Sequence, residues 1–152
     1  MMTSFVFRLE RFLKLRVHKE RECAESLGAA VRAEEESRRQ AEDRAAHVKT
    51  IVTRISEETT SAVSTAGALR NRGLALEAAV HQAASAEDSH RDAKKATDVE
   101  RELWGKARVE RRMIERLRER REGEWATSAA RAEQKETDET AARVRPTRGW
   151  GT

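Results

Sequence analysis

Apolar residues recur along the N-terminal half of the chain at alternating steps of four and three residues. Starting from Leu9, this spacing visits sixteen positions up to Ala62, and ten of them are apolar. The ten are Leu9, Leu13, Cys23, Leu27, Ala30, Ala41, Val48, Ile51, Ile55 and Ala62. A seam sustained over about eight heptads is typical of a helix that packs against another helix. The pattern predicts a first long helix over residues 1–63.

A looser apolar seam follows in the C-terminal half and predicts a second long helix over residues 69–142. Its clearest members are Val99, Leu103, Ala107, Ile114 and Leu117, with Trp104 and Trp125 nearby. The almost entirely polar stretch Glu87–Asp98 interrupts it and predicts a bent or frayed helix there. Between the two halves, Ser, Thr, Asn and two Gly residues gather in Glu57–Gly73, which favours a turn at residues 64–68.

The two predicted helices give an all-α fold, an antiparallel coiled-coil hairpin in which the two termini meet. The only proline is Pro146, so no proline breaks either helix. Residues 143–152 are expected to form a disordered tail. The alternative is one unbroken rod that dimerises, because Gly67 and Gly73 would each cost a helix only about 1 kcal/mol. The Ser and Thr residues around them favour the turn.

The composition supports long helices over a compact globular domain. Leu, Ile, Val and Phe make up about 16% of the 152 residues, and 25 of the 57 hydrophobic residues are alanines. This is too little for a thick core. The net charge of +4 is small and helix-forming residues dominate, which argues against disorder.

Cysteine usage and hydropathy bear on the cellular compartment. Cys23 is the only cysteine, so the chain can form no internal disulfide. No run of 18 apolar residues could span a membrane. Arg8 interrupts the start of the chain before a secretory signal could form. We therefore expect a cytoplasmic protein.

The sequence carries no pattern typical of catalysis. The four histidines (His18, His47, His81 and His90) are not spaced as paired metal ligands, and there is no glycine-rich phosphate loop. Acid–base chemistry needs groups held in a pocket, which a two-helix rod lacks. We expect no enzymatic activity and no catalytic, cofactor or metal site.

Two basic amphipathic segments, near opposite ends of the sequence, would meet in an antiparallel hairpin. The first is Phe5–Val17, which contains all three phenylalanines. The second is Trp104–Arg143, in which residues 105–121 carry eight basic and three acidic side chains. Four carboxylates follow at Glu133, Glu136, Asp138 and Glu139.

These end motifs resemble those of the FliJ family of flagellar export proteins. The matching residues are Phe7-Arg8-Leu9-Glu10-Arg11 with Leu13, then Glu115-Arg116-Leu117-Arg118-Glu119-Arg120, and finally Glu133-Gln134-Lys135 with Asp138-Glu139. The resemblance covers essentially the whole chain in length and architecture. It implies an antiparallel two-helix coiled coil similar to the central stalk of rotary ATPases.

The resemblance also implies partners and sites. Such a protein binds the hexameric flagellar export ATPase, contacts the cytoplasmic domain of the export gate and escorts empty substrate chaperones, peripherally at the cytoplasmic face of the inner membrane. The end expected to contact the ATPase carries Arg8, Arg11, Arg16, Arg116, Arg118, Arg120 and Arg121. A face early in the second helix, expected to contact the gate, carries Leu74, Leu76, Val80 and Ala83, without the family's aromatic residue.

Three alternatives remain. The chain could be a generic coiled-coil scaffold without an export role. Its basic amphipathic N-terminus could bind anionic membranes, although the same apolar face is needed to close the hairpin. The pI of about 9.6 raises nucleic-acid binding. Glu110, Glu115 and Glu119, interleaved with the arginines, argue against nucleic acid because they would repel phosphate.

Overall fold

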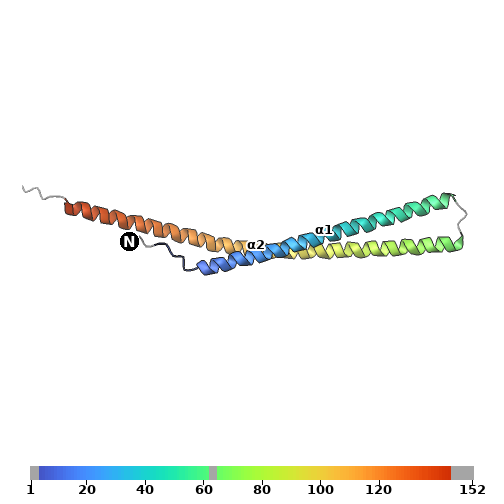
Figure 1. The fold of residues 1–152 in the computed structure, drawn as a ribbon, viewed down its shortest axis with the longest axis horizontal. Coiled ribbons are helices and arrows are strands. Elements are labelled where there is room, and N and C mark those ends of the chain that lie inside the picture. The colour runs from blue at the N-terminus through green and yellow to red at the C-terminus, as the bar shows by residue number, and fades with distance from the viewer. Residues whose placement is uncertain (1–3, 62–64, 145–152) are drawn as a thin grey trace, which may run out of the picture. The chain divides into compact units, whose positions relative to one another are not determined.

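The computed structural model describes the backbone of residues 4–61 and 65–144, and side chains at 4–58 and 65–143. Over these residues it contains two helices, α1 (Glu10–Ser61) and α2 (Ala66–Val144), and no strand (Figure 1). The predicted all-α fold of two long helices packed against each other is confirmed.

Contacts divide the chain into two compact units. Met1–His18 and Arg108–Thr152 form one, called here the terminal unit, and Lys19–Ala107 form the other, the central unit. Each unit therefore combines part of α1 with part of α2.

Within the central unit the helices run antiparallel. Arg72 forms an ion pair with Glu58 at 2.7 Å, and Arg44 donates a hydrogen bond to the Gln82 side chain at 3.1 Å. Further along, Ser37 Oγ lies 3.4 Å from His90 Nδ1. As the residue number on α1 falls from 58 to 37, the number of its contact on α2 rises from 72 to 90. This is the pairing expected of an antiparallel hairpin.

The seam predicted on α1 is confirmed. Of the predicted positions between 13 and 58, all but Arg44 are buried or half-buried. Leu9 is 40% exposed, and position 62 lies outside the described residues. Several seam positions are polar, including Glu20 and Glu34, so the four-three spacing identifies the packed face better than the residue types do.

The seam predicted on α2 is wrong at Val99 and Leu103, which are 56% and 45% exposed. The packed face instead carries Thr97, which is 1% exposed, and buried Ala107, with Trp104 half-buried between them. The Thr97 hydroxyl donates a hydrogen bond to the Ala93 carbonyl at 3.1 Å, so a polar side chain is tolerated there. Small and polar residues occupy this seam, so the positions of the larger apolar residues do not identify the packed face of α2.

The prediction of a frayed helix at 87–98 is wrong, because α2 is continuous through this stretch. The bend predicted there stays a prediction. Ion pairs along the helix, Arg91 with Asp88 at 2.9 Å and Lys95 with Asp92 at 3.4 Å, support its exposed face. A narrow stripe of half-buried residues, including His90, suffices for packing.

Thr65 fixes the start of α2. Its side-chain oxygen accepts a hydrogen bond from the Ala68 N–H at 3.3 Å, and its carbonyl accepts one from the Leu69 N–H at 3.1 Å. The helix therefore begins at Ala66, three residues before the expected start at 69. Residues 62 and 63 of the expected first helix, residue 64 of the expected turn and residues 145–152 of the expected tail lie outside the described part of the chain.

The packed interior is thin. Among the described residues, the buried apolar side chains are Leu13, Ala41, Ala79 and Ala107. Three of the four are alanines, as the composition predicts. In the same part of the chain, no helix has the length and apolar character needed to cross a membrane.

Candidate interaction surface

The terminal unit joins the start of the chain to the later part of α2 (Figure 1). The Phe5 ring packs against Trp125 in a tilted arrangement, with ring centres 6.1 Å apart. Leu13 is buried, and Arg118 pairs with Glu10 at 3.5 Å. Aromatic packing and ion pairing therefore hold the N-terminal segment against α2.

Three of the seven predicted arginines form ion pairs inside this unit, and we call Arg16, Arg118 and Arg121 the paired arginines. Arg16 pairs with Glu110, and its guanidinium lies 4.8 Å from the centre of the Phe12 ring. Arg121 pairs with Glu124 at 3.0 Å. Because these pairs are partly exposed, each contributes only about 0–1 kcal/mol. The Arg16 and Arg118 pairs link α1 to α2, whereas the Arg121 pair lies within α2.

The remaining four, Arg8, Arg11, Arg116 and Arg120, are called the unpaired arginines. All four are exposed, and none forms a hydrogen bond or ion pair with another residue that the structure describes. Their charge is not neutralised by a neighbouring carboxylate. The sequence placed all seven arginines in one set, and the structure separates them into two.

An apolar recess, called the terminal recess, lies between the N-terminal segment and α2. It has a volume of about 950 Å³. Its lining comprises Phe5, Val6, Phe7, Arg8, Leu9, Leu117, Arg121, Glu124, Trp125 and Ser128. Six of these ten are apolar, and the charged members include one unpaired arginine.

Sequence reasoning missed the terminal recess. The sequence does contain a pattern that points to it. Trp125 follows the half-buried seam positions 104, 111 and 118 at steps of seven residues. This spacing places Trp125 on the packed face of α2, where an antiparallel partner would bring the N-terminal phenylalanines. What the spacing could not show is the non-helical path of residues 4–7.

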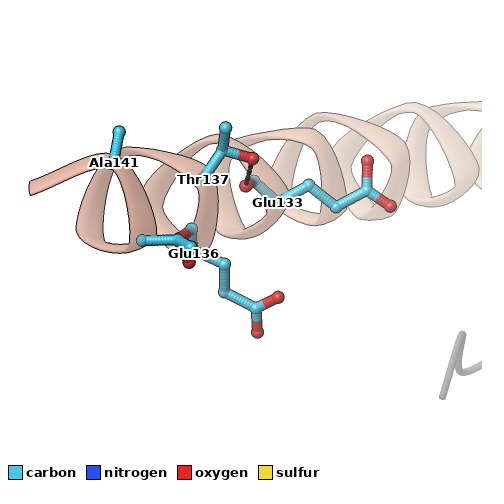
Figure 2. Close-up of a pocket in the computed structure, with 5 residues that line it drawn as sticks. Glu133, Glu136, Thr137 and Ala141 are labelled. Carbon is cyan, nitrogen blue, oxygen red and sulfur yellow. Dashed lines mark hydrogen bonds between the residues drawn. The ribbon is translucent and has the colours of Figure 1, made fainter. Parts of the chain in front are cut away.

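The C-terminal part of α2, residues 131–143, is exposed at every position. Figure 2 shows Glu133 and Glu136 projecting from this helix beside Thr137, whose hydroxyl donates a hydrogen bond to the Glu133 carbonyl at 2.9 Å. The depression there is lined by Glu133, Glu136, Thr137, Thr140 and Ala141, all from one helix. These residues offer an acidic surface and no enclosed site.

The four residues expected to contact the export gate do not share one exposed face. Leu74 and Val80 are 58% and 50% exposed, whereas Leu76 and Ala83 are half-buried. Only the first two leave half or more of their surface exposed to a partner.

No group of three or more His, Cys, Asp or Glu side chains arranged to hold a metal occurs in the described part of the chain. Cys23 is a half-buried free thiol. Among the described residues, one carboxyl is clearly perturbed: hydrogen bonds from Arg38 lower the pKa of Glu35, whose side chain is 42% exposed, to about 2. This belongs to a surface ion-pair cluster and marks no reactive pocket.

Comparison with known proteins gives one match. The family model described as "Flagellar FliJ protein" matches residues 5–147, nearly the whole chain. No curated protein and no solved structure gives a significant match. The matched range includes both basic segments and the acidic end of α2.

Proposed function

The chain belongs to the FliJ family, and we propose on that premise that it is a stalk that binds the hexameric flagellar export ATPase. The family membership makes it a coiled-coil protein associated with flagellar protein export. The observation that supports the ATPase as a partner is the set of four unpaired arginines in the terminal unit.

The physical role of these arginines follows from their having no ion pair with another residue that the structure describes. Arginines already paired with carboxylates would have to break those contacts before meeting a partner, whereas Arg8, Arg11, Arg116 and Arg120 need not. Complementary charge speeds encounter and fixes orientation more than it adds affinity. The unpaired arginines would meet acidic surfaces of the ATPase ring, while the contacts of Arg16 with Glu110 and of Arg118 with Glu10 stay in place.

The test neutralises the unpaired arginines together, as R8Q, R11Q, R116Q and R120Q. We expect binding to the ATPase, measured by co-purification and titration at low salt, to fall about tenfold or more. Helicity by circular dichroism should stay unchanged, because these side chains make no described ion pair.

The matched control removes the same number of charges from the central unit. Arg32, Arg54, Arg70 and Lys94 are exposed and form no ion pair with another described residue. The variant R32Q, R54Q, R70Q and K94Q should bind the ATPase within about twofold of the unchanged protein. Equal loss in both variants would show that net charge alone drives binding and would contradict the proposed site.

The remaining roles are part of the same proposal. Leu74 and Val80, as the exposed members of the early α2 face, would contact the cytoplasmic domain of the export gate, and substrate chaperones would be escorted from the same stalk. The protein would work in the cytoplasm, peripherally at the inner-membrane face. The L74S and V80S variants together should weaken gate binding and leave ATPase binding unchanged.

A further inference from the structure

The terminal recess exposes apolar surface that the described residues leave uncovered. Val6 is 76% exposed, Leu9 40% and Trp125 37%. Phe5 packs on Trp125, and both residues line the recess. The volume of about 950 Å³ is in the range of protein binding pockets and exceeds what one small side chain needs.

Charge at the rim identifies what kind of occupant fits. Arg8 lines the recess, is exposed, and has no ion-pair partner among the described residues. Arg121 also lines it but already pairs with Glu124 at 3.0 Å. The recess therefore offers an apolar floor with one available cation, which complements a bulky apolar side chain next to a carboxylate.

We infer that the terminal recess receives an acidic amphipathic helix of the partner, with bulky apolar side chains on the recess floor and a carboxylate on Arg8. Binding of this kind places the apolar face of a helix in a groove. The inference rests on the proposed function, because the partner is taken to be the export ATPase. Beyond that function, the inference is that apolar contacts in the recess, and not charge alone, stabilise the complex.

A protein segment fits this surface better than a lipid bilayer does. A membrane-binding helix presents one continuous apolar face. Here the apolar side chains come from a non-helical segment and from α2, and they surround a hollow that includes Glu124.

The experiment compares Val6→Glu with Val109→Glu in the full chain. Both valines belong to the terminal unit and are exposed, at 76% and 59%, so neither substitution should unfold the protein. Only Val6 lines the recess. We expect V6E to weaken binding of the purified export ATPase about tenfold or more, even at about 0.5 M salt, where exposed charges are screened. V109E should change binding less than about twofold.

A second readout reports on the recess directly. In a W104F, W150F background Trp125 is the only tryptophan. Its fluorescence should shift to shorter wavelength and become less accessible to acrylamide when the ATPase binds. The shift should be absent in V6E and present in V109E.

The outcomes separate the two proposals. If the unchanged protein does not bind the ATPase, the proposed function fails and the inference fails with it. If it binds but V6E binds equally well, or Trp125 emission does not change, the inference is overturned and the proposed function stands. A Trp125 shift with phosphatidylglycerol vesicles and none with the ATPase would overturn the inference in favour of a lipid surface.

Discussion

Glu35 accepts hydrogen bonds from two arginines of its own helix. Arg38 donates two, at 3.0 and 2.8 Å, and Arg39 donates one at 3.1 Å. These contacts stabilise the charged carboxylate and lower its pKa from 4.5 to about 2. All three contacts lie within α1, so they support this helix locally and do not hold α1 against α2.

The lowered pKa predicts a pH dependence at this residue. Because the folded pKa lies below the unfolded value, the stabilisation is fully present above about pH 4.5 and is lost as the pH falls through about 2. An NMR titration of the Glu35 side-chain carbonyl should give a midpoint near 2. In R38Q the midpoint should rise toward 4.5, because Arg38 is the largest cause of the shift. The control R32Q should leave it unchanged, and an unmoved midpoint in R38Q would contradict the assignment.

At the scale of the helix, the register of α2 decides which residues matter for stability. Leu103 is 45% exposed, whereas Ala107 is 7% exposed and lies on the packed face. A large apolar residue is therefore peripheral to the seam, and a small one is central to it. Large apolar residues are usually expected to pack between helices, but here the small residue does so and the large one is exposed.

Two substitutions test this register. L103Q should change the free energy of unfolding by less than about 0.5 kcal/mol, because it replaces an exposed residue with another good helix former. A107Q should cost about 2 kcal/mol or more, because a larger polar side chain must enter the packed seam. Urea unfolding followed by circular dichroism measures both. A larger loss of unfolding free energy for L103Q than for A107Q would contradict this register and support the seam predicted from the sequence.

The two helices differ in how far the sequence predicts them. On α1, apolar residues such as Leu13, Ile51 and Ile55 mark the same face as the four-three spacing, so pattern and structure agree. On α2, Thr97 and Glu100 occupy the packed face while Val99 is exposed, so apolar character and spacing disagree. A narrow interface accepts small or internally hydrogen-bonded side chains, and hydropathy cannot identify these.

The candidate site was predictable only in part. The basic segments and their meeting in one unit follow from charge and antiparallel pairing. The division of the arginines does not, because it depends on which carboxylate lies across from each one, such as Glu10 beside Arg118. The terminal recess also depends on tertiary contact between residues far apart in sequence, such as Phe5 and Trp125.

For the whole molecule, stability must come from many small contacts along α1 and α2, since the buried apolar residues are few. Residues 131–143 are all exposed and contribute little buried surface. A chain ending after Ala130 should therefore unfold with a free energy within about 0.5 kcal/mol of the full chain. Circular dichroism should show a loss of helical signal that matches the helical residues removed and no further loss.

A shorter chain provides the contrasting case. Ending after Arg116 also removes Arg118 and Trp125, and with them the contacts to Glu10 and Phe5. This truncation should cost about 2 kcal/mol or more, because half-buried Leu117 is lost as well. Thermal unfolding of both truncations measures the difference. Equal stability of the two would show that the N-terminal segment is not held by α2.

The antiparallel pairing also sets an order in time. Arg44 and Gln82 are separated by 38 residues along the chain, Ser37 and His90 by 53, and Arg16 and Glu110 by 94. Closing a longer loop costs more chain entropy, so contacts nearer the turn form more readily. During synthesis, at about 5–20 residues per second, the segment Phe5–Val17 is made several seconds before Trp125. The terminal recess is thus completed among the last contacts, and a prematurely ended chain would lack the surface that we propose for the partner.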